Sequence, residues 1–282
     1  MALKITSASQ YTLEDLTDFY NQTRVDYLVP MPMSPDVMGE YIHDFDVDLD
    51  LSPIIHDADS GQFFGIGMLG VRERENSTWV TRLGVTPQSR RSGAGGAAMD
   101  TMMENSRKLG AKKVILEVIK NNTPAQTLFQ KTGFQKTKEF LVLRRAPLRP
   151  PLSPEGQITW LYRKDALAAL RSYPYPLTWI NALASMENAS MFQGFSLTMK
   201  SGAKAWMVYR HKKHSITHFV FHTERGNPAK MARNLLLYLH LQYHRMDAYA
   251  ENFFADDPHL SAFFDLGYFE AFRRIEMVND SV

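Results

Sequence analysis

Hydrophobic and polar positions follow two different periods along the first 86 residues of the chain. Apolar residues recur every three or four positions after the capping-box pattern Thr12-x-x-Asp15. They do so again after Ser34-Pro35-Asp36, where a cap precedes a proline at the first helical position. These patterns predict two helices, the second running to about Phe45. Short apolar runs bounded by turn-forming residues predict strands at 3–5, 51–56, 62–71 and 77–85.

The segment 83–96 joins an apolar run to a helix through a basic, glycine-rich loop. The run stops at Pro87, and three glycines lead into a helix that Gly110 is placed to end. The helical pattern, with spacings of three and four, comprises Met99, Met102, Met103, Ser106 and Leu109. The first N–H groups of a helix have no internal partner, and the helix dipole adds partial positive charge there. The segment therefore predicts an anion site, to which Arg90 and Arg91 add charge. A flexible strand-to-helix connection is the alternative for this loop taken alone.

The pattern continues with a strand at 113–119, a helix at 124–131 and a last strand at 139–145. Together with the earlier elements they predict an α/β sandwich, which the strand 139–145 closes. Four prolines then fall within residues 146–156, a density that neither a helix nor a central strand tolerates. We therefore place a domain boundary at this segment.

The second half of the chain repeats the first at an offset of 134 residues. Gly133-Phe134 recurs as Gly267-Tyr268 (267 − 133 = 134), and the helix after the glycine-rich loop recurs within 227–243. The repeated helix keeps an apolar face of Met231, Leu235, Leu236 and Leu239, after strands at about 194–200, 203–210 and 214–223.

The repeat sets the fold class and the domains. The fold class is α/β (α+β), with two tandem domains, each a mixed, mostly antiparallel sheet flanked by helices. The expected boundaries are 1–146 for the first domain, 147–156 for a proline-rich linker and 157–282 for the second domain.

The second copy of the loop has lost the features of an anion site. At the same offset, Glu224 replaces Arg90, and Asn227 and Ala229 replace two of the glycines. Pro228 also removes an N–H donor. Only the first copy is therefore expected to bind an anion.

Composition narrows the function classes. The chain has 282 residues, 44% of them hydrophobic, and a net charge of +2, which is too small to indicate nucleic acid or an anionic membrane as a partner. The absence of cysteine from the sequence excludes disulfides, thiolate metal sites and a cysteine nucleophile. The first residues lack an apolar signal-peptide region, and no apolar run reaches about 18 residues. We therefore expect a cytoplasmic protein.

Two motifs resemble those of the GNAT N-acetyltransferase superfamily. Arg90-x-x-Gly93-x-Gly95, preceded by Val85-Thr86-Pro87, is similar to its pyrophosphate loop R/Q-x-x-G-x-G/A. The spacing fits neither a P-loop nor the dinucleotide pattern G-x-G-x-x-G. A second family motif matches at Leu116, Glu117, Val118, Asn122, Ala125, Leu128, Gly133 and Phe134. The resemblance covers residues 1 to about 146.

This resemblance implies that the first domain binds acetyl-CoA and transfers its acetyl group to an amine. It places the pyrophosphate on the loop and the thioester carbonyl on a backbone N–H of Val85 or Leu83, while Asn122 donates to the cofactor or to a substrate amide. The cofactor-binding residues implied are Leu83, Gly84, Val85, Arg90, Arg91, Ser92, Gly93, Ala94, Gly95, Gly96, Asn122 and Phe129.

The resemblance also suggests Glu117 as the catalytic base that takes the proton of the amine. A structural role is the alternative, since Glu251 occupies the equivalent place in the second copy. The family's usual acid is a tyrosine twelve residues after this glutamate, where the chain has Phe129. Either another group protonates the thiolate, or the thiolate leaves unassisted, or the domain binds coenzyme A without turnover.

The histidines do not form a convincing metal site. His214, His218 and His222 recur every four residues, which on a strand spreads their Cα atoms over about 26 Å and leaves neighbours about 13 Å apart. His240 and His244 fit one helix face but lack an evident third ligand. We therefore predict no metal.

The favoured function is an acetyl-CoA-dependent N-acetyltransferase acting on a primary amine of a small molecule or peptide. The second copy would then complete the acceptor groove or an oligomer such as a homodimer. A non-catalytic coenzyme A sensor or scaffold is the alternative. Aminoacyl transfer from tRNA is disfavoured, because it needs a strongly basic face. The acidic run from Asp44 to Asp50 is interpreted as a solvated loop rather than a rim that recognises a cationic acceptor.

Overall fold

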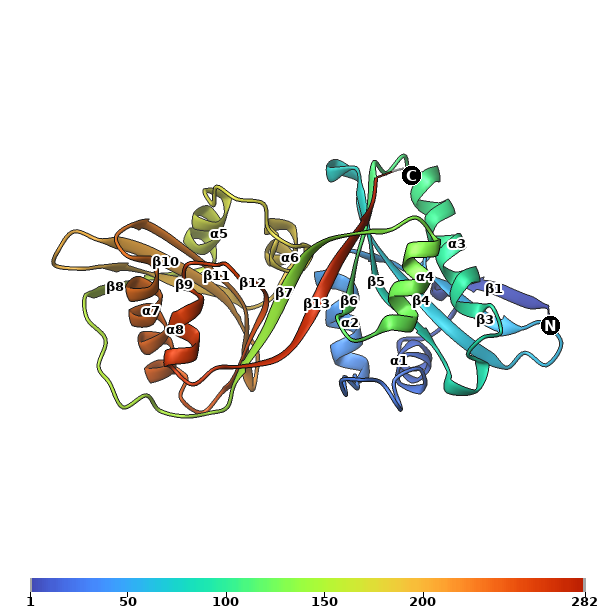
Figure 1. Ribbon diagram of the computed structural model, residues 1–282, viewed down its shortest axis with the longest axis horizontal. Coiled ribbons are helices and arrows are strands. Elements are labelled where there is room, and N and C mark those ends of the chain that lie inside the picture. Colours follow the sequence, from blue (N-terminus) through green and yellow to red (C-terminus); the bar gives the residue numbers. More distant parts are fainter. Residues whose placement is uncertain (1, 281–282) are drawn as a thin grey trace. The chain divides into compact units, whose positions relative to one another are not determined.

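The computed structural model describes residues 2–280. They form two compact units (Figure 1). The first comprises the described residues up to Lys138 together with those from Ile275 onward, and the second comprises Glu139–Arg274. Each unit is a mixed, mostly antiparallel sheet flanked by helices, which confirms the predicted fold class.

The first unit has the strands β1 (Leu3–Ser7), β2 (Val47–Asp48), β3 (Pro53–Asp57), β4 (Phe63–Arg72), β5 (Ser77–Val85) and β6 (Lys113–Ile119), joined by the end of β13 (Phe269–Asn279). Its helices are α1 (Leu13–Gln22), α2 (Pro35–Asp44), α3 (Ala94–Lys108) and α4 (Thr123–Lys131). The strand order is β1-β3-β4-β5-β6-β13, and β2 pairs with β4. Only β5 and β6 pair in parallel among the neighbours from β1 to β6.

The two predicted N-terminal helices begin where their capping residues place them. The Thr12 hydroxyl accepts a hydrogen bond from the Asp15 N–H (3.1 Å), and the Asp15 carboxylate accepts one from the Thr12 N–H, so the capping box is formed. Ser34 caps α2 in the same way, ahead of a proline at its first position. The sequence predictions of both helices are confirmed.

The helices of the first unit cover opposite faces of its sheet. Leu83 and Val85 of β5 pack against Ala94 and Ala98 of α3. Gly84 between them faces the other side, because successive side chains of a strand point to opposite faces. A Cβ on Gly84 would lie 2.2 Å from the hydroxyl oxygen of Thr23, the residue that caps α1. Only glycine allows the end of α1 to approach β5 this closely.

The second unit is built in the same way. Its strands are the end of β7 (Gln135–Arg145), β8 (Gln157–Leu161), β9 (Phe192–Thr198), β10 (Lys204–His211), β11 (Ser215–Arg225) and β12 (Asp247–Phe254), in the order β7-β12-β11-β10-β9-β8. Its helices are α5 (Arg163–Arg171), α6 (Leu183–Asn188), α7 (Pro228–Gln242) and α8 (Leu260–Asp265). The offset of 134 residues carries the bounds of α3 onto those of α7 and the bounds of β7 onto those of β13.

The ends of the two repeated strands differ from the sequence prediction. The segment 139–145 does not close the first sheet but pairs with β12 in the second unit. The first unit instead contains the end of β13, whose Ile275 and Met277 pack with Leu116 and Val118. An alternating pattern identifies a strand and its buried side chains, but it carries no information about which sheet the strand joins.

The proline-rich segment predicted as a linker lies within the second unit, where it is held by several hydrogen bonds. Arg145 Nη2 donates to the carbonyl of Leu148 (2.7 Å), and the Tyr238 hydroxyl donates to that of Gly156 (2.7 Å). The division between the two units therefore falls at Lys138 and Ile275 rather than at residues 147–156.

Candidate active site

The strands β5 and β6 separate toward their carboxyl ends. Their parallel pairing covers residues 77–80 and 113–116 and, within the described part of the chain, goes no further. Residues 81–85 and 117–119 therefore flank an opening in the sheet, with unpaired edges available to a ligand.

The backbone of β5 turns two peptide groups toward this opening. The Thr86 N–H donates to the Phe64 carbonyl on β4 (2.9 Å). Because peptide groups alternate in direction along a strand, those of Leu83 and Val85 face away from β4. Arg24 confirms this direction, since its Nη2 donates to the Leu83 carbonyl (3.3 Å) from the side of the opening.

The glycine-rich loop delivers the chain to the start of α3 with its backbone donors available. Arg91 and Gly93 have φ angles of 68° and 92°, and Gly93 is the N-cap without a side chain to cap the helix. The first helical bond runs from the Ala97 N–H to the Gly93 carbonyl (2.9 Å). The N–H groups of Gly95 and Gly96 precede it, so they have no partner within the helix.

The first turn of α3 is packed on one side and open on the other. A Cβ on Gly95 would lie 3.4 Å from Leu128 of α4 and 3.5 Å from Val85 of β5. A Cβ on Gly93 or Gly96 would meet no atom within 4 Å. The fold thus brings the predicted residues of β5 beside the predicted loop and leaves space over the glycines. This arrangement fits a pyrophosphate.

The two arginines of the loop are in different states. Arg90 pairs with Asp26, with Nη1 and Nη2 at 2.8 and 2.5 Å from the two carboxylate oxygens. The hydrogen bond from Arg90 lowers the pKa of the Asp26 carboxyl, which keeps this ion pair charged at neutral pH. Arg91 is exposed. Ser92 Oγ accepts from the Ala94 N–H (3.3 Å), so one of the predicted donors has a partner within the loop.

Glu117 lies on the other face of the sheet from α3. Its neighbours Leu116 and Val118 pack toward α3, so Glu117 faces the side of α1 and α2. Tyr41 of α2 lies on this side, and burial raises the pKa of its hydroxyl, against the effect of Arg82 and with that of Glu117. The half-buried Glu117 carboxylate thus lies within electrostatic range of a buried tyrosine.

Sequence reasoning missed the arginines and tyrosines on this face. The guanidinium carbon of Arg82 lies 4.1 Å from the ring centroid of Tyr41. That of Arg24 lies 4.1 Å from the ring of Tyr27 and 5.1 Å from that of Tyr20. The sequence did contain signals for them. Arg82 is the one charged residue of its strand, and Tyr20, Arg24 and Tyr27 are spaced by four and three.

The last two predicted residues lie at α4. Asn122 caps the helix by accepting a hydrogen bond from the Ala125 N–H (3.3 Å), and its Nδ2 donates to the Tyr27 hydroxyl (3.5 Å). Phe129 is 6% exposed and packs near Phe134, with 6.3 Å between the ring centroids. Phe129 is thus a core residue and has no proton to donate.

The comparisons with known proteins agree with this arrangement. Residues 13–134 match the sequence model of the acetyltransferase (GNAT) family. They form a GNAT domain. No curated protein is similar enough in sequence to match the chain.

Some solved structures share the fold of this chain over both of its units, the GNAT domain and the second unit. A tandem GNAT protein from the clavulanic acid biosynthesis pathway is 14% identical, with a TM-score of 0.68 and 98% of each chain covered. A GCN5-related N-acetyltransferase from Sphaerobacter thermophilus is 16% identical, with a TM-score of 0.66, covering 98% of this chain and 95% of that one. At these identities the likeness concerns the fold, and it supports the tandem arrangement. The family supports acetyl-CoA-dependent N-acetyl transfer as the general activity.

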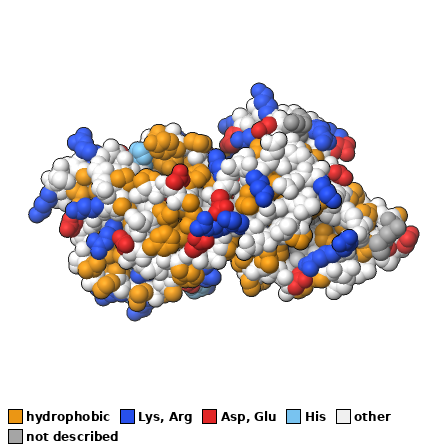
Figure 2. Space-filling view, in the orientation of Figure 1, with side chains coloured by type: hydrophobic (Ala, Val, Ile, Leu, Met, Phe, Trp, Pro, Cys, Tyr) orange, Lys and Arg blue, Asp and Glu red, His pale blue; other side chains and the backbone are white. Residues whose placement is uncertain are grey.

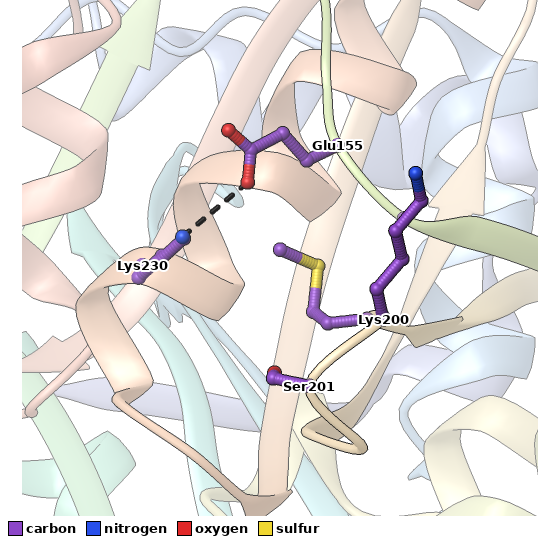
Figure 3. Close-up of a pocket in the computed structure, with 6 residues that line it drawn as sticks. Glu155, Lys200, Ser201 and Lys230 are labelled. Carbon is purple, nitrogen blue, oxygen red and sulfur yellow. Dashed lines mark ion pairs between the residues drawn. The ribbon is translucent and has the colours of Figure 1, made fainter.

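In the second unit, the helix start equivalent to that of α3 is capped by a side chain. Asn227 caps α7 with its own side chain, which accepts a hydrogen bond from the Lys230 N–H (2.9 Å). A cavity of about 400 Å³ lies beside this turn, and there the Lys230 ammonium pairs with the Glu155 carboxylate at 3.3 Å (Figure 3). The N–H group left open at Gly96 in the GNAT domain thus has an internal partner at the equivalent position, Lys230, in the second unit.

None of the helices within residues 2–280 is long and apolar enough to cross a membrane. The same residues contain no group of three or more histidines and carboxylates placed to hold a metal ion. On the face that Figure 2 displays, basic and acidic side chains are interspersed.

Proposed function

We propose that the protein transfers the acetyl group of acetyl-CoA to the primary amine of a small molecule or peptide, and that the first unit alone does so. The observation that carries this proposal is the contrast between two equivalent helix starts. Gly93 has no side chain to cap α3 and leaves the N–H groups of Gly95 and Gly96 open to an anion, whereas the side chain of Asn227 caps α7.

Acetyl-CoA supplies the acetyl thioester. The N–H groups of Gly95 and Gly96, with Arg91, hold its pyrophosphate, and the Leu83 or Val85 N–H polarises the thioester carbonyl. Glu117 takes the proton of the amine, whose nitrogen forms the new C–N bond as the C–S bond breaks. A thiol has a pKa of about 8.5, so the thiolate is able to leave without a dedicated acid in place of Phe129.

The first test is calorimetric titration with acetyl-CoA of the parent protein and of Gly93→Asp. The variant puts a negative charge where the pyrophosphate is expected. Gly110→Asp is the matched control, since Gly110 also has a positive φ and open space but lies at the other end of α3. We expect one site per chain in the parent and the control, and none in Gly93→Asp. Two sites would mean that the second unit also binds, and no binding to the parent would overturn the proposal.

A non-catalytic coenzyme A sensor is the second candidate, and the burial of Phe129 favours it. A screen of acetyl transfer to a library of primary amines separates the two functions. Release of free coenzyme A in step with amine acetylation supports the enzyme. Tight binding of acetyl-CoA without turnover of any amine supports the sensor.

A further inference from the structure

Two arginines lie on the face of the first sheet that carries Glu117. Both stack on tyrosines, and two of these tyrosines are almost fully buried: Tyr20 is 1% exposed and Tyr41 is 7% exposed. Guanidinium groups in such surroundings are poorly hydrated and are expected to have a charged or strongly polar partner.

Arg24 lacks such a partner. Its Nη2 donates to the neutral carbonyl of Leu83 at a long 3.3 Å. Its Nε is buried and has no hydrogen-bond partner in the part of the chain that the structure describes. The closest acid along the chain, Asp26, pairs with Arg90 instead. The buried hydroxyl of Thr81 on β5 also has no partner among the described residues.

The position of Arg24 relates this donor to the reaction. Its guanidinium lies at the Leu83 carbonyl, on the part of β5 that faces the opening, and Glu117 borders the same opening on β6. A planar guanidinium fork matches the two oxygens of a carboxylate better than it matches a single carbonyl. A molecule with its amine at Glu117 and a carboxylate at Arg24 would give Arg24 the charged partner that it lacks among the described residues.

The alternative acceptor, a purely cationic amine held by the acidic run, finds no support in that run. Asp44 is 4% exposed, Asp46 pairs with Arg72 at 2.8 Å, and Asp48 accepts backbone hydrogen bonds from Asp50 and Leu51. These carboxylates hold their own loop and strand together.

We propose that the acceptor is an amine that also carries a carboxylate, as an amino acid does, and that Arg24 binds this carboxylate. The inference rests on the proposed function, because it assumes that the acceptor amine meets Glu117. It makes Arg24 a specificity-determining residue.

The test compares leucine, phenylalanine and glycine with their own carboxamides. Binding is measured by calorimetry, with and without coenzyme A, and acetylation is measured as kcat/KM with acetyl-CoA. Amidation lowers the pKa of the amine, which by itself favours the carboxamide as a nucleophile, so a preference for the carboxylate cannot come from the amine. The variants are Arg24→Gln and Arg24→Lys, with the exposed Arg107→Gln at the far end of α3 as the control.

We expect a preference for the carboxylate of about tenfold or more in the parent and in Arg107→Gln. Arg24→Gln should abolish this preference, and Arg24→Lys should retain part of it, because lysine keeps the charge but not the fork. Acetylation of carboxamides as efficient as that of amino acids would overturn the inference and leave the proposed function standing. So would a failure of every amino acid to bind at millimolar concentration while acetyl-CoA binds. If the parent protein does not bind acetyl-CoA, the proposed function is overturned. The titrations of amino acids without coenzyme A would still decide the role of Arg24.

Discussion

At the scale of single residues, the proposed base Glu117 gives a direct test of the chemistry. It faces the side of Tyr41 and Arg82, where the amine is proposed to enter. Glu117→Gln keeps the shape and removes the base, so we expect kcat to fall by roughly 10²- to 10⁴-fold while the Kd of acetyl-CoA stays unchanged. Steady-state kinetics and calorimetry measure the two quantities. The exposed Glu104→Gln is the control, and an unchanged kcat in Glu117→Gln would assign this residue a structural role.

At Gly96, a side chain is expected to stabilise the helix but to weaken ligand binding. It lies in the first turn of α3, and a Cβ there would meet no atom within 4 Å. Gly96→Ala should therefore raise the free energy of unfolding by about 0.5–1 kcal/mol, because alanine is the better helix former. The same methyl group would occupy the space proposed for the pyrophosphate, so the affinity for acetyl-CoA should fall.

Urea unfolding and calorimetric titration of Gly96→Ala measure these opposite changes. Asn105→Ala in the last turns of α3 is the comparison for a substitution that leaves the ligand site alone, although it loses a hydrogen bond to Leu51. A Gly96→Ala variant that binds acetyl-CoA as tightly as the parent would show that the ligand does not approach this turn.

At the scale of elements, the segment that follows α1 contacts three of the predicted cofactor-binding residues. Arg24 donates to the Leu83 carbonyl, Asp26 pairs with Arg90, and the Tyr27 hydroxyl accepts from Asn122. The segment 24–27 thus bridges the two strands and the loop around the opening. If acetyl-CoA binds at these residues as proposed, it has to replace these contacts, so we expect the segment to oppose binding.

The pair of Asp26 and Arg90 gives a direct test of this opposition. Asp26→Asn removes the negative charge that competes with the pyrophosphate for Arg90, so we expect acetyl-CoA to bind roughly two- to fivefold more tightly. The gain should shrink as salt concentration rises, because both side chains are half exposed. Calorimetric titrations at low and high salt measure it. Asp18→Asn on the exposed side of α1 should leave the affinity unchanged, and weaker binding by Asp26→Asn would contradict the competition.

The same elements show what a sequence can predict and what it cannot. Thr12, Ser34 and Gly110 mark helix ends through local backbone chemistry, and the helices begin or end beside them. The glycine loop was predictable for the same reason. The ion pair between Arg90 and Asp26, 64 positions apart in the chain, depends on tertiary packing that no local pattern encodes.

At the scale of the whole molecule, the two halves of the chain have corresponding helices and strands but differ in the residues at the proposed anion site. The helices α3 and α7 correspond residue by residue, yet one start is open and the other is capped by Asn227. The strands β7 and β13 also correspond, and each has its end in the unit formed mainly by the other half of the chain. Comparing the two halves of the sequence reveals the difference between α3 and α7, because the residues at their starts have changed. The placement of the ends of β7 and β13 depends on strand pairing, which the sequence leaves open.

The second unit buries the titratable side chains of His218 and His240. His240 of α7 is fully buried, with Nε2 at 2.9 Å from the Tyr268 hydroxyl, and Nδ1 has no hydrogen-bond partner among the described residues. Burial, with a smaller effect of Arg145, lowers the pKa of His240 to about 3. Burial lowers that of His218, in the same unit, to about 3 as well. Both histidines are therefore neutral in the folded protein at neutral and mildly acidic pH.

These pKa values predict that acid destabilises the second unit. In the unfolded state a histidine has a pKa near 6.5, whereas the pKa of His240 in the folded state is about 3. The unfolded state therefore binds more protons between these two pH values. The free energy of unfolding should fall as pH drops below 6.5, by about 1.4 kcal/mol per pH unit for each histidine. Calorimetric melting between pH 7.5 and 5 measures this fall. His240→Gln, which keeps a polar partner for Tyr268, should be less stable than the parent at pH 7.5 but lose stability less steeply, whereas the exposed His214→Gln should keep the parent's slope. Equal slopes in the parent and in His240→Gln would mean that His240 accepts its proton without unfolding.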